Sequence, residues 1–397
     1  MIVINNKSII VLAFIIFSSP VFSKNLDKYP DFSWDSMPLY MHVWKKTSYT
    51  KAEIEYLAGY PLITLEKVQG REEGTIQEGT LKAARAIKKI NPNTKILYYK
   101  NIVIDWESAA SKDLPNIAGS YLQTVDGNYP VVNNRSKARF FDISNTEVHK
   151  WWLKDAKEML SNSSIDGLFI DANIKVLIES YFSNAKKLGK DKAQDLIQGY
   201  HTLLNAINDE FRDNNIILAN ILRARFKQGG LEYMDYFDGS YFEAFEHNVG
   251  GISKADYLVK GIEAGQSAAR NGKILAFTAG LGKAIKNDSS GIGLDEARKK
   301  IDNFDQVQQR LDYLTAIFLV MAEKYSYFYP HDGYGVQINR KGEQINNLWM
   351  HTFPLLKKRL GAPLGPAKRD GYVFTREFKY CSVYLNVEAE EATLLWK

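Results

Sequence analysis

The sequence predicts an α/β fold, a (β/α)8 barrel that carries a small β-strand appendage at its C-terminal end. Short apolar runs alternate along the chain with longer amphipathic runs, which is the pattern of parallel strands joined by helices. Eight such units can be counted, and eight strand-helix pairs in one chain most simply close into a barrel. An open, doubly wound sheet uses the same alternation, but no glycine-rich phosphate loop follows the first strand.

The eight expected strands are short runs rich in β-branched and aromatic residues. Several of them are continuously apolar, as expected of parallel strands that are buried on both faces. In chain order they are Leu39 to Trp44, Leu62 to Val68, Lys95 to Ile102, Gly167 to Ala172, Asn215 to Leu222, Phe237 to Ala244, Lys273 to Thr278 and Tyr325 to Tyr329.

Helix-start signals lie between these strands. Thr50 with Glu53, and Ser144 with Glu147, each fit a capping box ahead of a periodic segment. We therefore expect one helix to begin after Thr50 and another after Ser144. Later helical segments are expected at Lys192 to Arg212, Lys254 to Asn271, Asp295 to Glu323 and Asn347 to Leu360.

Two connections are longer than a barrel needs, and both follow strands on the face where such barrels carry their active sites. Residues 105–142 contain a candidate hairpin around Asp126-Gly127, and residues 280–293 form a candidate lid. Beyond the last helix, three β-rich runs predict a meander. We therefore divide the chain into a signal at residues 1–23, a barrel at 24–365 and a β meander at 366–397.

The first residues predict export. Lys7 precedes an apolar run from Ile9 to Phe17, and small residues follow it up to Ser23. This is the pattern of a secretory signal that is cut after Ser23, and its apolar run is too short to anchor the chain in a bilayer. We expect a secreted or periplasmic protein.

The charge and the cysteine count exclude several classes of protein. A formal net charge of +5 over 397 residues is too small to argue for nucleic-acid binding. Cys381 is the only cysteine, so no intramolecular disulfide can form. The oligomeric state is not indicated by the sequence.

Two acids end expected strands and are our candidate catalytic pair. Asp171 follows Gly167-Leu-Phe-Ile, and Glu243 follows Gly239-Ser-Tyr-Phe. Catalytic side chains of barrel enzymes lie at these strand ends, and glycoside hydrolysis needs one proton-donating carboxyl and one carboxylate that attacks or activates water. The alternative is that Asp171 caps the next helix and Glu243 is a solvated loop acid. Glu246 is the main competitor for the role of Glu243.

Further polar and aromatic residues at strand ends are candidate substrate-binding residues, because a cleft of aromatic faces and carboxylates suits a carbohydrate. Any single aromatic residue among them is as consistent with core packing. They are Trp44, Glu66, Tyr98, Tyr99, Asp105, Asn220, Tyr241, Tyr329, His331 and Asp332.

Other chemistries have weaker support. The six histidines show no zinc-site spacing. The pair His331-Asp332 fits a substrate hydroxyl better than a metal ion. Cys381 lies in the expected meander, and no G-x-S-x-G elbow is present. We expect no metal and no cofactor.

Several stretches together resemble the hypothetical glycoside hydrolase families of TIM-barrel type, which are named from sequence similarity rather than from assayed activity. The resemblance covers most of the mature chain. It implies that Asp171 is the nucleophile and Glu243 the acid/base residue. The stretches are Phe141-Asp-Ile-Ser-Asn-Thr-Glu147, His149-Lys-Trp-Trp152, Ser164-Ile-Asp-Gly-Leu-Phe-Ile-Asp171, Asp238-Gly-Ser-Tyr-Phe-Glu243, Leu360-Gly-Ala-Pro-Leu-Gly365, Gly371-Tyr-Val-Phe-Thr-Arg-Glu-Phe378 and Val383-Tyr-Leu-Asn386.

The sequence thus predicts an exported glycoside hydrolase that cleaves a polysaccharide or oligosaccharide with two carboxylates. One alternative is an inactive barrel that binds polysaccharide as a module of a surface or export system. Another is a lyase or transglycosidase on the same fold. The sugar, the linkage and the stereochemistry stay open.

Overall fold

The computed structural model describes residues 26–106, 112–133, 136–243, 245–249, 251–281, 304–330, 335–336, 349–350 and 353–397. All eight expected strands are present and parallel, in sequential order around the sheet. They are β1 (Tyr40–Lys45), β2 (Leu62–Leu65), β3 (Lys95–Asn101), β4 (Gly167–Asp171), β5 (Ile216–Asn220), β6 (Gly239–Phe242), β7 (Ile274–Ala279) and β8 (Ser326–Pro330).

The sheet closes into a barrel between its first and last strands. Leu39, at the start of β1, forms a parallel bridge with Phe328 of β8, and the Phe328 amide donates to the Pro38 carbonyl at 2.8 Å. A two-residue strand, β9 (Gly335–Val336), pairs in parallel with the last two residues of β1. The predicted (β/α)8 barrel is therefore confirmed, and the open-sheet alternative is wrong.

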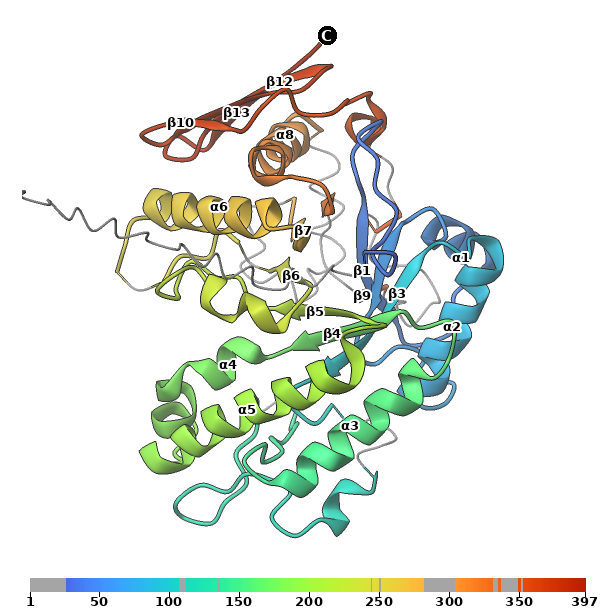
Figure 1. Cartoon of the computed structure of the whole chain (residues 1–397), viewed down its shortest axis with the longest axis vertical. Coiled ribbons are helices and arrows are strands. Elements are labelled where there is room, and N and C mark those ends of the chain that lie inside the picture. Colours follow the sequence, from blue (N-terminus) through green and yellow to red (C-terminus); the bar gives the residue numbers. More distant parts are fainter. Residues whose placement is uncertain are drawn as a thin grey trace, which may run out of the picture.

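Helices surround the barrel on the sides seen in Figure 1, with α1 and α2 on the right, α3 and α5 below the strands, and α6 and α8 above them. Shorter helical turns lie at Leu114–Asn116, Tyr181–Ala185, Leu231–Tyr236 and Pro354–Lys357. The helices are α1 (Lys51–Leu57), α2 (Ile76–Ile90), α3 (Thr146–Leu160), α4 (Asn173–Leu177), α5 (Lys190–Phe211), α6 (Lys254–Arg270) and α8 (Phe304–Met321).

One of the two predicted capping boxes is confirmed. Thr50 and Glu53 exchange both bonds of the box at the start of α1. At α3 the capping residue is Asn145 rather than Ser144, because the Asn145 side chain accepts from the Glu147 amide while the Ser144 hydroxyl donates to Asp142. The prediction at Ser144 was wrong by one residue.

The predicted helix at Asn347 to Leu360 is wrong in its described part. Only the single turn Pro354–Lys357 is helical there. A proline lacks the amide that a helix interior needs and disfavours helical geometry in the residue before it, and Phe353 accordingly adopts an extended conformation. The first residues of the predicted helix at 295–323 and most of the candidate lid at 280–293 lie outside the described residues.

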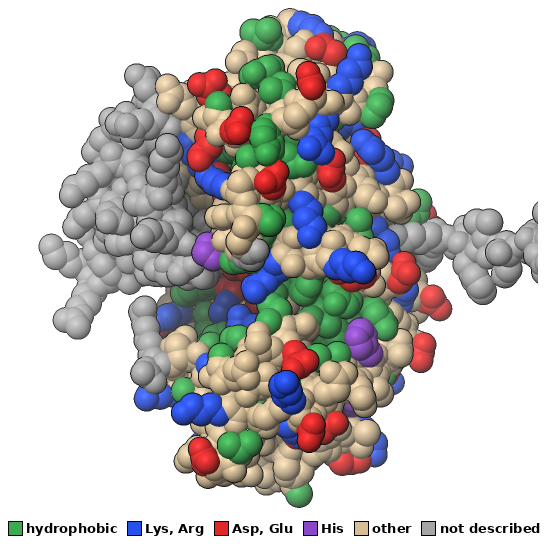
Figure 2. All heavy atoms as spheres, turned by 90° about the vertical axis from the view of Figure 1, so that its left-hand side faces the viewer, with side chains coloured by type: hydrophobic (Ala, Val, Ile, Leu, Met, Phe, Trp, Pro, Cys, Tyr) green, Lys and Arg blue, Asp and Glu red, His purple; other side chains and the backbone are tan. Residues whose placement is uncertain are grey.

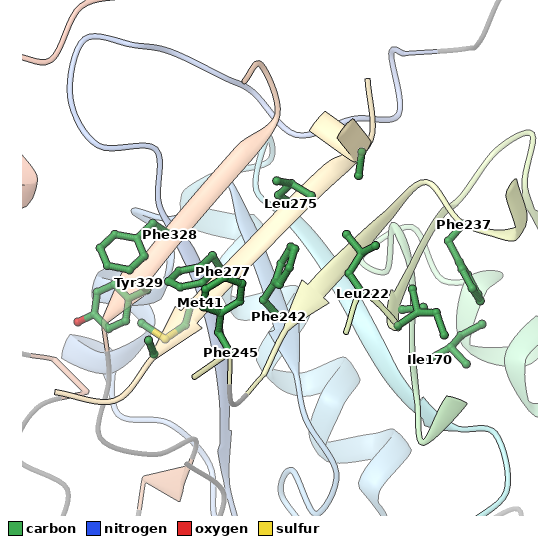
Figure 3. Packing of buried hydrophobic residues seen from close by; sticks show 14 of the residues in the cluster. Met41, Ile170, Leu222, Phe237, Phe242, Phe245, Leu275, Phe277, Phe328 and Tyr329 are labelled. Atoms are coloured by element: carbon green, nitrogen blue, oxygen red, sulfur yellow. The ribbon is translucent and has the colours of Figure 1, made fainter. Parts of the chain in front are cut away.

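Alternate strand residues fill two separate cores. On β3, Leu97 and Tyr99 point into the barrel, whereas Ile96 and Tyr98 pack against the helices. Figure 3 shows the outer core over neighbouring strands, where the ring of Phe277 lies 6.0 Å from that of Phe242. This period of two decides which strand-end residues can reach the mouth of the barrel.

An Asp-Gly pair at the amino end of each strand positions both candidate catalytic strands, β4 and β6, in the same way. At the amino end of β4, the Asp166 carboxylate accepts from the amide of Ile96 at 2.8 Å. At the amino end of β6, the Asp238 carboxylate accepts from the amide of Ile217 at 3.0 Å. The glycines that follow allow close strand contact, since a Cβ on Gly167 or Gly239 would lie 2.1 Å from a backbone oxygen of the next strand.

The C-terminal residues form a separate antiparallel sheet of four strands in sequential order, seen in red above α8 in Figure 1. Its buried Arg376 donates to the backbone carbonyls of Leu319 and Ala322 in and just after α8. The strands are β10 (Lys368–Asp370), β11 (Val373–Glu377), β12 (Cys381–Asn386) and β13 (Glu391–Trp396). Among the helices that the structure describes, none is long and apolar enough to span a membrane.

Candidate active site

Both candidate catalytic acids lie at the carboxyl ends of barrel strands. Asp171 is the last residue of β4, and Glu243 follows the last residue of β6. In Figure 1 the chain leaves β4 toward the left, where α4 begins. The left side faces the viewer in Figure 2, where acidic and basic side chains are visible in a hollow beside the grey atoms. This is the face on which barrel enzymes build their sites.

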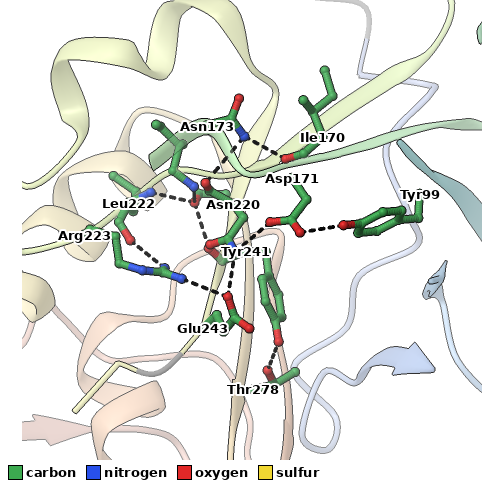
Figure 4. Close-up of polar contacts among 12 residues, drawn as sticks. Tyr99, Ile170, Asp171, Asn173, Asn220, Leu222, Arg223, Tyr241, Glu243 and Thr278 are labelled. Carbon is green, nitrogen blue, oxygen red and sulfur yellow. Dashed lines mark hydrogen bonds and ion pairs between the residues drawn. The ribbon is translucent and has the colours of Figure 1, made fainter. Parts of the chain in front are cut away.

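Asn220 connects the two acids from the intervening strand β5. Its side-chain nitrogen donates to Asp171 Oδ1 at 3.2 Å and to Glu243 Oε2 at 2.8 Å (Figure 4). Because one nitrogen contacts both oxygens, Asp171 Oδ1 and Glu243 Oε2 are no farther apart than the two bond lengths together, about 6 Å.

Asp171 is held in its charged form. Burial by itself would raise the pKa of this carboxyl, but the Lys67 ammonium, the Tyr99 hydroxyl and other donors outweigh burial and lower the pKa below its ordinary value. Tyr99 donates to Asp171 Oδ2 at 2.6 Å. Asp171 does not cap α4. The N-cap position of this helix is held by Ala172, which has a left-handed backbone conformation. The helix-cap alternative for Asp171 is therefore wrong.

An ion pair between the buried Glu66 and the partly buried Lys67 lies at the end of β2 beside this centre. The Lys67 ammonium bonds Glu66 Oε1 and lies 5.3 Å from the centre of the Tyr99 ring and 5.5 Å from that of Trp106. The other Glu66 oxygen is buried and has no hydrogen-bond partner among the residues that the structure describes. Burial raises the pKa of Glu66 to about 7 in spite of the neighbouring Lys67.

Glu66 is expected to give the folding free energy a distinctive pH dependence. Its pKa rises from 4.5 to about 7 on folding, so its stabilising contribution is present below pH 4.5 and is lost as the pH rises to 7. The loss amounts to about 3 kcal/mol at most, at roughly 1.4 kcal/mol for each pH unit.

Urea unfolding of the wild type and Glu66→Gln between pH 4 and pH 8 measures this loss. The stability of the variant relative to the wild type is expected to rise by about 3 kcal/mol over this range. A constant difference between the two proteins would show that folding leaves the pKa of Glu66 unchanged.

Glu243 has a second partner in Arg223, whose guanidinium lies 3.5 Å from Glu243 Oε2. The side chain of Glu243 is 31% exposed, so it borders the open mouth of the barrel. The competitor Glu246 instead forms an ion pair with Arg310 and lies 3.7 Å from Lys254. Of the two acids, Glu243 is the one bonded to the group around Asp171.

The predicted aromatic residues divide between the two sides of the barrel wall. Tyr241 is buried inside it, where Thr278 donates to its hydroxyl at 2.7 Å, and Trp44 is partly buried against the same interior cluster. Tyr98 points outward and donates to Asp155 of α3 at 3.3 Å. Tyr329 also points outward and bonds the Tyr56 hydroxyl at 2.6 Å. The structure therefore does not bring Tyr98 or Tyr329 to the two acids.

The remaining predicted residues lie at the edge of the site or outside the described residues. Asp105 follows β3 and accepts from the Tyr121 hydroxyl at 2.7 Å. His331 and Asp332 lie outside the described residues. Within the described part of the chain, His, Cys, Asp and Glu side chains nowhere form a group of three that could hold a metal ion.

Sequence reasoning missed two cations of this site, Lys67 and Arg223. Each follows a predicted site residue closely, because Lys67 is adjacent to Glu66 and Arg223 lies three positions after Asn220. Both are basic residues directly after apolar strands, and a search of strand ends for cations as well as acids would have found them.

A comparison with protein families identifies one match. The model of the hypothetical glycosyl hydrolase family 15 matches residues 88–382, which is more than half of the chain and includes β3 to β8. No curated protein sequence matches this chain.

Solved structures show remote likenesses to the chain. The glycoside hydrolase domain of PelA from Pseudomonas aeruginosa is 12% identical with a TM-score of 0.42, covering 67% of this chain and 90% of that one. A noncanonic maltogenic α-amylase, AmyB from Thermotoga neapolitana, is 10% identical with a TM-score of 0.45, covering 88% and 86%. An Anoxybacillus α-amylase is 11% identical with a TM-score of 0.47, covering 89% and 87%.

Proposed function

The chain belongs to the hypothetical glycosyl hydrolase family 15, and from this membership we propose that it is an exported enzyme that hydrolyses O-glycosidic bonds of a polysaccharide or oligosaccharide. The observation that supports the mechanism is the pair of carboxylates, Asp171 and Glu243, which share one amide donor at the mouth of the barrel. Retaining glycosidases hold their two carboxyl groups about 5 to 5.5 Å apart and inverting ones about 6.5 to 9.5 Å apart, and the shared donor supports the shorter, retaining separation.

In the proposed first step Asp171 attacks the anomeric carbon. A lowered pKa keeps this carboxylate ionised, as a nucleophile requires. Glu243 donates its proton to the departing glycosidic oxygen, so that the C–O bond breaks as the new bond to Asp171 forms.

In the second step Glu243 takes a proton from water, and the water oxygen displaces Asp171 from the anomeric carbon. The enzyme returns to its starting protonation state, and the net reaction consumes one water molecule for each bond cleaved. Asn220 positions the two acids through its hydrogen bonds, and the charge of Lys67 offsets that of Asp171 throughout.

Export is proposed from the N-terminal segment alone. Its short apolar run and the small residues up to Ser23 are the features of a cleavable secretory signal. A substrate outside the cytoplasm, in the periplasm or beyond the cell, would be consistent with it.

The test of this function is a reducing-end release screen of the mature protein against α- and β-linked bacterial polysaccharides. We expect release from at least one polymer. Binding to a polymer without release from any of them would favour a polysaccharide-binding barrel without catalysis. Unsaturated products would indicate a lyase.

A further inference from the structure

A groove lies outside the barrel mouth, between the β3–α3 connection and the start of α5. Its volume is about 590 Å³, which is within the range of about 300 to 1,000 Å³ that ligand sites occupy. Both polar and apolar side chains line it. Those that matter for its chemistry are Tyr121, Gln123, Val125, Tyr129, Arg139 and Lys192.

We propose that this groove binds sugar residues of the same polysaccharide chain whose bond is cleaved between Asp171 and Glu243. The proposal rests on the proposed function and deepens it, because it assigns the enzyme a long-chain substrate and an outer binding site.

The side chains of the groove suit a carbohydrate. Tyr129 is 48% exposed, and its ring centre lies 6.4 Å from that of Tyr121 in an edge-to-face arrangement. The guanidinium of Arg139 lies 4.9 Å from the Tyr129 ring and 5.4 Å from the Tyr121 ring. The groove thus combines aromatic faces for sugar C–H groups with hydrogen-bond donors for hydroxyls.

Backbone and ion-pair contacts hold the groove in shape before any ligand binds. The Val125 amide donates to the Lys187 carbonyl at 3.1 Å, which ties the rim to the segment before α5. Two other lining residues, Lys192 and the buried Asp142, form an ion pair at 2.5 Å. A preformed groove loses little entropy when a ligand binds.

The turn at residues 124–128 is closed by a bond from the Thr124 amide to the Asn128 carbonyl. Its flanking segments pair with residues 139–141 rather than with each other, because Tyr121 bridges Phe141 and Val131 bridges Arg139. The prediction that the two segments around Asp126-Gly127 pair with each other as a hairpin is therefore wrong. The actual pairing places Tyr121, Tyr129 and Arg139 together.

Asp105 links the groove to the strand that lies beside Asp171. Asn101 of β3 is directly opposite Asp171 of β4 in register. Asp105 follows four residues later, so its Cα lies within about 14 Å of that of Asn101. Asp105 in turn accepts from Tyr121, which lines the groove. The proposed path of a chain bound between the two acids therefore runs past Asp105 into the groove.

Tyr129→Ala removes the most exposed aromatic face of the groove. The matched control is Tyr384→Ala, since Tyr384 is 40% exposed on β12, at the opposite end of the molecule from the β3–α3 connection (Figure 1). On long chains of the polymer identified by the release screen, Tyr129→Ala is expected to raise KM roughly three- to tenfold with kcat unchanged. KM for di- and trisaccharides, and all constants of Tyr384→Ala, should stay at the wild-type values.

Affinity gel electrophoresis in gels that contain soluble starch, dextran, alginate or chitosan tests binding without turnover. At least one polymer should retard the wild type and Tyr384→Ala, and should retard Tyr129→Ala less. Hydrolysis of long chains by Tyr129→Ala with an unchanged KM would overturn the groove proposal and leave the hydrolase intact. Groove-dependent retardation without hydrolysis would overturn the hydrolase and keep the groove. No groove-dependent retardation by any polymer, together with no effect on KM, would likewise overturn the groove proposal.

Discussion

Asp171→Asn and Glu243→Gln are each expected to lower kcat by about 10³- to 10⁵-fold on the cleaved polymer, as is typical when a residue that acts on the reacting bond is removed. Asp171→Asn replaces the attacking carboxylate with a neutral amide. Glu243→Gln removes the proton that the departing oxygen takes up. Both amides keep the size of the acid and can still bond Asn220, so the fold should persist.

Initial rates of reducing-end release, measured beside circular dichroism spectra, check this prediction. The matched control is Glu246→Gln, because Glu246 lies three positions from Glu243 but is paired with Arg310. Its kcat should stay within about threefold of the wild type. Loss of activity in Glu246→Gln, with activity retained in Glu243→Gln, would exchange the roles of these two acids.

Asp238→Asn is expected to destabilise the fold by about 3 to 5 kcal/mol, because it leaves the buried charge of Lys28 without its partner. Lys28 Nζ lies 2.7 Å from Asp238 Oδ2, and their side chains are 7% and 1% exposed. The same carboxylate accepts from the Ile217 amide of β5. The variant therefore loses an ion pair and weakens the contact that holds the start of β6 against β5.

Urea unfolding at neutral pH measures this loss. Asp235→Asn, at an exposed position three residues earlier, should change the unfolding free energy by no more than about 0.5 kcal/mol. In the double variant Lys28→Met/Asp238→Asn, the loss should be smaller than the sum of the two single losses, because neither charge remains buried alone. Equal unfolding free energies of Asp238→Asn and the wild type would show that the Lys28–Asp238 ion pair does not stabilise the fold.

The barrel and the position of its site could be predicted from the sequence because both depend on local patterns. Apolar runs of strand length recur eight times, and the acids Asp171 and Glu243 end two of them after the same Asp-Gly start. The structure explains this repetition, since the first Asp bonds a neighbouring strand and the Gly permits close contact with another strand.

Features that depend on orientation or on distant partners could not be predicted. Tyr98 and Tyr99 are identical in type and adjacent, yet only Tyr99 points inward to Asp171. Glu66 appears in the sequence as an ordinary strand-end acid, and its raised pKa follows from burial that only the folded chain creates. The bridge made by Asn220 likewise requires three strands to be placed side by side.

The anomer that forms first during hydrolysis tests most directly whether Asp171 and Glu243 act as a nucleophile and acid pair. Proton NMR of the reaction within the first minutes distinguishes the two anomers before they interconvert. We predict retention, with the product carrying the configuration of the cleaved bond, because the two carboxyl oxygens are held within about 6 Å by one amide nitrogen. An inverted product would contradict direct attack by Asp171.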